Sequence, residues 1–131
     1  MRKPELDYAF LAGYAAIRNG SLTALDASFT EMRVPQTQQK IEFSLAGRIR
    51  ADAQAQAVPL RIEVVLPGDY AVVAVDVALP TSNAVRYDGK AGVMFSFRFN
   101  LPAVNLGLHV IRVSVDGGTP RELKFDLIWE A

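Results

Sequence analysis

The sequence predicts an all-β domain of about eight strands, arranged as two antiparallel sheets packed face to face. Apolar and polar residues alternate with a period of two along most of the chain, which is typical of strands with one buried face. Turns containing glycine or proline separate these runs, and no long segment has the 3.6-residue period of an amphipathic helix. A parallel sheet would need crossover helices. The pattern therefore favours an immunoglobulin-like or C2-like β-sandwich, with a closed β-barrel as the alternative.

The first strand is expected in the segment YAFLAGYAAIRNG, residues 8–20. A basic start before an apolar run resembles an export signal, but Glu5 and Asp7 interrupt it, and RNGSL is a turn instead of a cleavage site. Asn19-Gly20 predicts a hairpin, because a type I′ turn needs two residues with positive φ. We therefore expect the segment before this turn to pair with residues 21–34, in which the alternation slips and predicts a bulge. Both faces of the first strand are apolar or small, as in a strand buried on both sides or covered by another subunit.

Six further runs alternate clearly and are separated by turn residues. Asp88-Gly89 and Asp116-Gly117-Gly118 are further hairpin signals, and Pro67-Gly68-Asp69 is another turn. Six prolines lie at predicted strand ends, where a strand tolerates them: Pro35, Pro59, Pro67, Pro80, Pro102 and Pro120. The six expected strands are residues 40–50, 59–67, 70–79, 92–100, 109–115 and 122–130.

Composition limits the classes of function. The 131 residues are the usual size of one domain, so we expect a single domain over residues 1–131. Fourteen basic and fourteen acidic residues give zero formal net charge, whereas nucleic-acid binders usually carry a basic excess. No apolar run is long enough to span a bilayer, and there is no cysteine for disulfides or thiolate chemistry. We expect a cytoplasmic protein that binds neither nucleic acid nor membrane.

Residues for catalysis are scarce. His109 is the only histidine, and no G-x-S-x-G segment exists to present a serine nucleophile to it. The sequence also lacks an H-E-x-x-H motif and the glycine-rich loops that bind phosphates. We therefore expect no enzymatic activity, no catalytic residues, no cofactor and no metal. His109 is expected to pack or to form a hydrogen bond near the start of a strand.

Two sets of residues are candidates for a binding surface. Five arginines lie on predicted polar faces: Arg48, Arg50, Arg61, Arg98 and Arg112. Together on one sheet they would form a cationic stripe for an anionic partner, and otherwise they pair across strands with Glu42, Glu63 and Asp126. Tyr87, in the connector VRYDGK, is expected to be the most exposed aromatic residue. Tyr87 could stack on a sugar together with the other aromatic candidates, or it could simply pack on the sheets. The other candidates are Tyr8, Tyr14, Tyr70 and Trp129.

Short motifs at both ends of the chain resemble a family of small, mostly bacterial domains of unassigned function. That family begins with a Leu-Ala-Asp-Tyr-Ala run followed by Asn-Gly-Lys-Leu, and it has a Gly-x-(Tyr or His) and an Asp-Gly motif near its end. Gly13 and Ser21 depart from it, where the family often has Asp and Lys. The resemblance implies a compact β-sandwich and no known activity. The matching residues are Leu11, Ala12, Tyr14, Ala15, Asn19, Gly20, Leu22, Gly107, His109, Asp116 and Gly117.

The function expected from the sequence is binding without catalysis. A protein–protein contact is favoured, through self-association of the apolar first strand or through pairing of an edge strand. Zero net charge offers little repulsion against such association. The alternative is a module that binds a small ligand, either a carbohydrate or an anion, through its loops or its arginine face.

Overall fold

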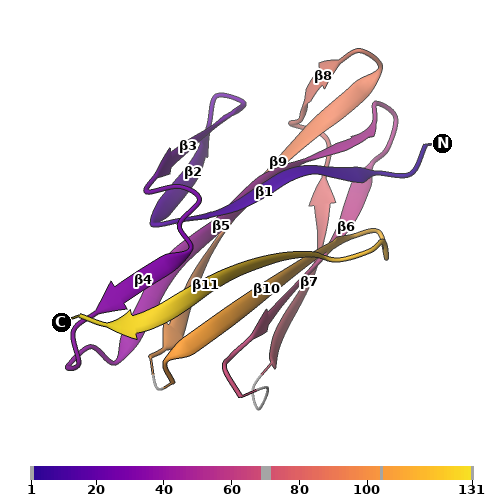
Figure 1. Ribbon diagram of the computed structural model, residues 1–131. Coiled ribbons are helices and arrows are strands. Elements are labelled where there is room, and N and C mark those ends of the chain that lie inside the picture. The colour runs from indigo at the N-terminus through magenta and orange to yellow at the C-terminus, as the bar shows by residue number, and fades with distance from the viewer. Residues whose placement is uncertain (1, 69–71, 104, 131) are drawn as a thin grey trace.

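The computed structural model describes residues 2–68, 72–103 and 105–130. These residues form eleven strands and no helix, so they contain no helix that could span a membrane (Figure 1). The all-β class is confirmed, but the expected number of about eight strands is wrong. The strands are β1 (Glu5–Ala12), β2 (Tyr14–Arg18), β3 (Ser21–Leu25), β4 (Glu31–Val34), β5 (Lys40–Asp52), β6 (Ala57–Val65), β7 (Val72–Pro80), β8 (Val85–Tyr87), β9 (Lys90–Pro102), β10 (Gly107–Val115) and β11 (Arg121–Trp129).

The strands form two larger sheets and one separate hairpin. The four-stranded sheet has the order β1-β5-β9-β8, and the five-stranded sheet has the order β4-β11-β10-β6-β7. Strands β2 and β3 pair only with each other, and no sheet closes into a barrel in the described part of the chain. The expectation of purely antiparallel sheets is wrong at one place. Strand β4 runs parallel to β11, with Glu31 opposite Asp126 and Val34 opposite Trp129.

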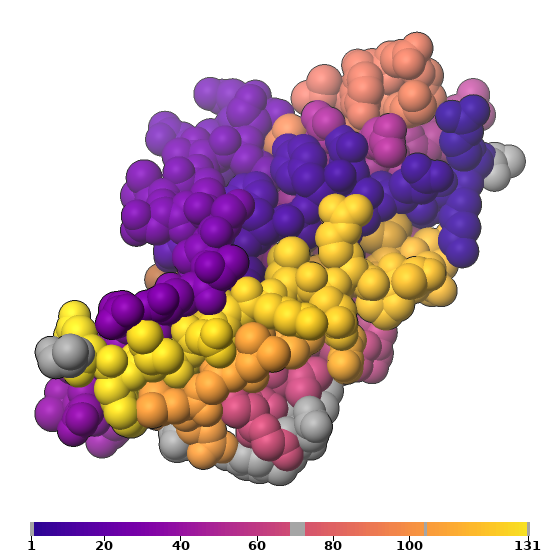
Figure 2. Space-filling view, in the orientation of Figure 1, coloured from indigo at the N-terminus to yellow at the C-terminus, as the bar shows by residue number. Residues whose placement is uncertain are grey.

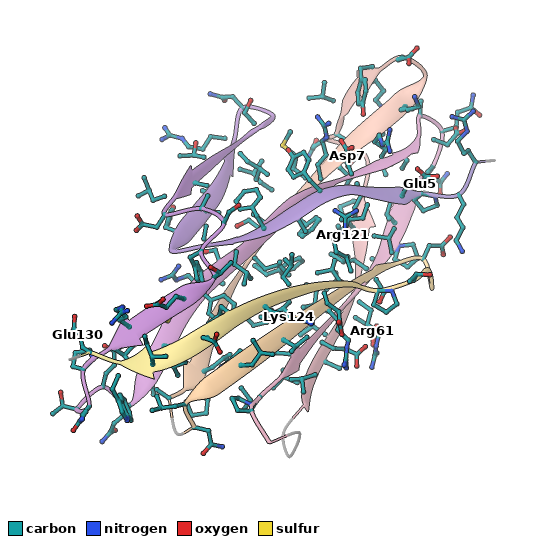
Figure 3. The ribbon with its side chains drawn as sticks, viewed as in Figure 1. Glu5, Asp7, Arg61, Arg121, Lys124 and Glu130 are labelled. Atoms are coloured by element: carbon teal, nitrogen blue, oxygen red, sulfur yellow. The ribbon has the colours of Figure 1, made fainter. Side chains whose placement is uncertain are left out.

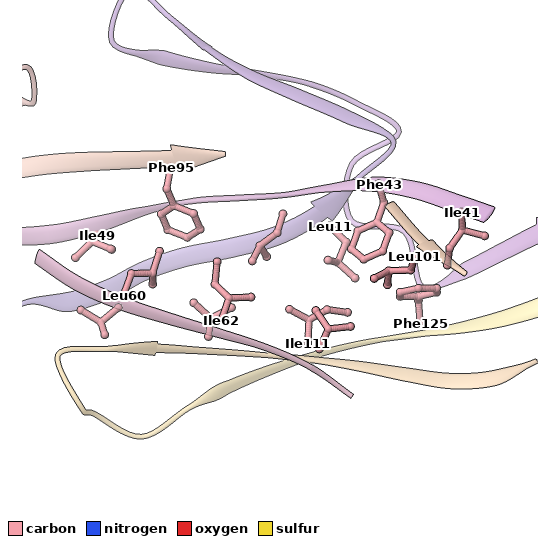
Figure 4. Packing of buried hydrophobic residues seen from close by; sticks show 14 of the residues in the cluster. Leu11, Ile41, Phe43, Ile49, Leu60, Ile62, Phe95, Leu101, Ile111 and Phe125 are labelled. Carbon is pink, nitrogen blue, oxygen red and sulfur yellow. The ribbon is translucent and has the colours of Figure 1, made fainter. Parts of the chain in front are cut away.

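The two larger sheets face each other across one hydrophobic core (Figure 4). Phe43 on β5 and Phe125 on β11 meet edge to face across it, with ring centroids 5.4 Å apart. Phe29, from the connection before β4, packs against Phe125 with a centroid separation of 5.3 Å. This burial is the main source of stability, at roughly 25 cal/mol per Å² of apolar surface. The largest fully buried side chains are Phe43, Phe95, Phe125, Ile41, Leu45, Ile49, Leu60, Ile62, Ile111, Leu127, His109 and Val58.

The apolar first segment does not form one continuous strand. The segment is divided at Gly13. The residues before Gly13 form β1 of the four-stranded sheet, and those after it form β2 of the hairpin. The hairpin packs on the outer face of β5 and β9, the face turned away from the core. Arg98 Nη1 donates to the Gly13 carbonyl over 2.7 Å, and Ser96 Oγ donates to the Ala15 carbonyl over 2.9 Å. Ala46, on this outer face, is completely buried. The outer face of β5 is therefore covered in part by the hairpin, whose strand β2 comes from the apolar first segment.

Three of the predicted glycine turns are confirmed by backbone conformation, and Asp69 of the fourth lies outside the described residues. Asn19-Gly20, Asp88-Gly89 and Asp116-Gly117 each place two consecutive residues at positive φ. The prediction that every named proline lies at a strand end is wrong for Pro59, which is the third residue of β6. Its carbonyl accepts a hydrogen bond from Asp116 N over 2.9 Å, at the end of β10. Its nitrogen points to the same side as this carbonyl, so no bond to β7 is lost.

Candidate interaction surface

The five candidate arginines do not form one stripe. Arg48, Arg50 and Arg98 lie on the outer face of the four-stranded sheet, on β5 and β9. Arg61 and Arg112 lie on β6 and β10, on the outer face of the other sheet. Figure 3 shows Arg61 on the five-stranded sheet, separated from the Glu5 and Asp7 side chains of β1. The core lies between the two sets, so a single anionic partner cannot contact all five.

Carboxylates accompany each of these arginines, and the expected cross-strand pairing is confirmed for Glu42, whereas Glu63 pairs with Arg61 on its own strand. Arg98 lies 3.3 Å from Glu42, the cross-strand pair expected from the sequence. Other partners come from strands whose positions the alternation could not supply. The remaining pairs are Arg48 with Asp7, Arg50 with Glu5 at 3.4 Å, Arg61 with Asp76 at 2.6 Å and with Glu63 at 3.6 Å, and Arg112 with Glu122 at 2.9 Å.

Arg48 and Tyr87 are the two candidates that the structure brings into contact. The Arg48 guanidinium lies 5.2 Å from the centroid of the Tyr8 ring and 5.8 Å from that of Tyr87, distances typical of cation–π contacts. Asp7 accepts hydrogen bonds from the same guanidinium, and this raises the pKa of Arg48. Tyr87 belongs to the short strand β8 and not to a loop, and it is 37% exposed. The cluster is internally neutralised and presents no unpaired cation.

Arg50 lines a pocket of about 420 Å³ near the start of β1. Its Nε is buried without a hydrogen-bond partner, and Asp7 Oδ1 lies 3.5 Å away. The walls carry both signs of charge, with four basic and three acidic side chains. Such a mixed lining does not select strongly for an anion. The charged lining residues are Arg2, Lys3, Arg50, Lys90, Glu5, Asp52 and Asp88.

His109 has the packing role expected from the sequence. Its side chain is buried, and its ring stacks on Phe125 with centroids 4.8 Å apart and an interplanar angle of 18°. Nδ1 donates to the Gly107 carbonyl over 3.0 Å, at the first residue of β10. Burial lowers the pKa of His109, since the charged imidazolium is poorly solvated there. Among the described residues, no group of three or more potential ligand side chains could hold a metal ion.

The edges of the two larger sheets differ in how they are protected against pairing with another chain. Strand β1 has a register shift between Leu6 and Tyr8 and carries Glu5 and Asp7. Strands β4 and β8 have four and three residues, and β4 also carries two charges. Beyond β8, strand β9 carries Arg98 and packs its outer face against the hairpin. Bulges, charges and short length are the usual ways in which proteins block edge-to-edge association.

Strand β7 lacks these forms of protection. It has nine residues, Val72–Pro80, and pairs with β6 along its whole length without a register shift. Asp76 is its only charged residue, and the hydrogen bond between Asp76 and Arg61 raises the pKa of the arginine. Val73 is 42% exposed. In the described chain β7 ends its sheet, so its outer edge has no neighbouring strand.

Hydrogen bonds near the start of β6 establish which backbone N–H and C=O groups of β7 point away from β6 and could pair with another strand. The Pro59 carbonyl faces β10, where it accepts from Asp116 N, and Pro59 stands opposite Ala78. Thr81 N donates to Gln56 O over 3.2 Å, directly before the first residue of β6, and this bond gives the same alternation. Since successive residues point their N–H and C=O groups to opposite sides, those of Ala74, Asp76 and Ala78 point away from β6.

The separate hairpin is a second exposed apolar feature. Tyr14 and Leu25 stand opposite each other on β2 and β3 and are 47% and 62% exposed. Figure 2 shows the hairpin region (violet) projecting beyond the part formed by β10 and β11. Tyr70, another aromatic candidate, lies outside the described residues.

The strand β7 was expected from the sequence, but its position at the edge of the sheet depends on long-range pairing. The local signal was a single charge in an otherwise apolar run.

Comparison with models of known protein families finds no match to this chain. Comparison with curated proteins likewise finds no significant similarity.

Proposed function

We propose that this chain is a β-sandwich interaction domain that acts without catalysis, by pairing the open edge of β7 with β7 of a second copy. The observation that carries the proposal is the contrast among the sheet edges. Strands β4 and β8 are short, β1 is charged and shifted in register, and β9 packs its outer face against the hairpin, whereas β7 offers nine regular residues with one charge. Strand addition at an open edge gains main-chain hydrogen bonds from the partner.

The composition of β7 supports a second copy as the partner. Antiparallel pairing about a twofold axis at Val75 places Asp76 of one copy opposite Ala74 of the other. Like charges then do not face each other, and the residues with outward N–H and C=O groups are paired. Arg61 compensates the Asp76 charge within each copy, and the chain has zero formal net charge. Such a contact joins two five-stranded sheets into one continuous sheet and is closed by symmetry.

Membership of the small bacterial family is part of the same proposal. The Leu11-Ala12 and Asn19-Gly20 matches support it, and those residues form the end of β1 and the turn of the hairpin. A cytoplasmic location is compatible with the cysteine-free sequence.

Sedimentation equilibrium over a wide concentration range tests the proposal. The wild-type chain should approach twice its mass of 14.3 kDa as concentration rises. Ala74→Pro should weaken the dimer, because proline lacks the N–H that the second copy needs while the bonds to β6 remain. By symmetry two hydrogen bonds are lost, and at about 1 kcal/mol each the dissociation constant should rise about 30-fold.

Ala74→Val is the matched control, because it keeps the N–H and favours a strand. It should leave the dimer intact. A wild-type chain that stays monomeric at every concentration would overturn the proposal. A dimer that resists Ala74→Pro would overturn the β7 contact and move attention to the exposed Tyr14–Leu25 pair of the hairpin.

A further inference from the structure

A pocket of about 710 Å³ lies at the end of the molecule where three separate segments meet. They are the connection between β4 and β5, the end of β9 and the end of β11. Trp129, which is partly buried against the core, lines the pocket together with Gln36, Gln39 and Asn100. Figure 3 labels the neighbouring Glu130, which marks this end of β11. The volume lies within the range of ordinary small-molecule sites.

Backbone hydrogen bonds hold the three segments together. Ala103 N donates to the Gln39 carbonyl over 2.8 Å and joins the end of β9 to the connection before β5. Glu130 N donates to the Val34 carbonyl over 2.8 Å and joins the end of β11 to β4. Leu101 on β9 lines the pocket with only 5% exposure. The walls are therefore supported by regular structure, and a ligand would need to order little backbone.

The lining has the chemistry of a site for a neutral saccharide. The Trp129 ring supplies an apolar surface on which the C–H face of a sugar ring can stack. Each amide side chain offers both a donor and an acceptor, as sugar hydroxyls require of their partners. Lys40 is the only charged residue among those lining the pocket. We infer that this pocket binds a neutral oligosaccharide, with Trp129 as the stacking surface and Gln36 and Gln39 as hydrogen-bonding groups.

A proline-rich peptide is the competing ligand for a pocket with an aromatic wall. Grooves for such peptides are lined by several aromatic side chains. Here Trp129 is the one aromatic residue among the lining residues of the described chain, and amides make up much of the rest. The observations therefore favour a sugar.

Intrinsic fluorescence reports directly on this pocket, because Trp129 is the only tryptophan in the sequence. The full chain is titrated with maltotriose and, separately, with cellotriose. We expect at least one of them to change the Trp129 emission saturably, with a midpoint in the millimolar range. The double variant Gln36→Ala/Gln39→Ala should abolish the change, while its circular dichroism stays that of the wild type.

Gln54→Ala is the matched control, because Gln54 is exposed in the turn after β5, outside the lining residues. It should bind as the wild type does. The inference is overturned if neither trisaccharide gives a saturable change, or if the double variant responds like the control. It is also overturned if hexaproline, and neither sugar, saturates the signal. Sedimentation of the Gln36→Ala/Gln39→Ala variant should be unchanged, so this test stands apart from that of the β7 contact.

Discussion

Replacement of Gly47 by alanine tests the packing between β1 and the core. Gly47 lies in the middle of β5, opposite Ala9 of β1. A Cβ added there would lie closer to the Tyr8 carbonyl oxygen than real Cβ atoms come to their neighbours, and 2.7 Å from Cζ of Phe95. Neither neighbour can move freely. The first is backbone beside the register shift of β1, and the Phe95 ring is 1% exposed in the core.

The expected loss of stability follows from two opposing effects. Overpacking of a rigid core costs about 1–3 kcal/mol, and the upper part of this range applies because backbone and ring must both shift. Alanine also lowers the conformational entropy of the unfolded chain, and this offsets about 0.4–1 kcal/mol of the lost stability. The net decrease in the free energy of unfolding should be about 2 kcal/mol. With an m-value of roughly 2 kcal/mol/M in urea, the unfolding midpoint should fall by about 1 M.

Urea unfolding followed by circular dichroism measures this change. Gly92→Ala is the matched control, because the nearest neighbours of an added Cβ there are Tyr87 Cε1 at 3.3 Å and Arg48 Cδ at 3.5 Å, on long side chains, and the Val85 carbonyl oxygen lies at an ordinary 3.8 Å. It should shift the midpoint by less than half as much. Phe95→Leu should lower the free energy of unfolding less in the Gly47→Ala background than in the wild type, because both changes affect the contact between positions 47 and 95. An unchanged midpoint for Gly47→Ala would refute this account of the β1 packing.

Two further predictions concern His109 and the hairpin. The pKa of His109 is lowered by burial, so the unfolded chain takes up a proton near pH 6.5 while the folded chain does so only at lower pH. The free energy of unfolding should therefore fall as pH drops below about 7. His109→Phe keeps a ring on Phe125 and should make the urea midpoint less dependent on pH between pH 7.5 and about 5. An equal pH dependence in both proteins would contradict this prediction. Arg98→Gln removes the donor to the Gly13 carbonyl, so amide hydrogen exchange in β2 and β3 should accelerate while that in β10 stays constant. Acceleration in both regions would instead indicate global destabilisation.

The strands were predictable where one face is buried and the other solvated. In residues 40–50 and 92–100 the alternation correctly identified the inward side chains, including Phe43 and Phe95. The alternation was less informative where a third layer covers the sheet. Ser44 lies on the predicted polar face, yet it is 1% exposed, because the β2–β3 hairpin packs there. A local pattern does not show burial caused by an element that is distant in the sequence.

The candidate surface was less predictable than the strands. The alternation predicted that the arginines lie on polar faces. Their partners Asp7 and Asp76 lie on β1 and β7, and the order of strands in the sheets determines that these strands are neighbours of the arginines. The exposed edge of β7 has the same cause, because the same alternating run could lie inside a sheet. Trp129 was recognised as one aromatic among several. Its pocket depends on the glutamine-containing connection that the β4–β11 pairing brings beside it.

The parallel pairing of β4 with β11 has a consequence for biosynthesis. Strand β11 occupies an interior position of the five-stranded sheet, between β4 and β10, although it is the last strand along the chain. Residues 31–34 are made early, but they cannot acquire their partner until residues 126–129 have left the ribosome. At synthesis rates of about 5–20 residues per second, β4 waits for several seconds with unpaired backbone groups. We expect its charged residues Glu31 and Arg33, which protect the edge of the folded sheet, to disfavour pairing with other nascent chains during this interval as well.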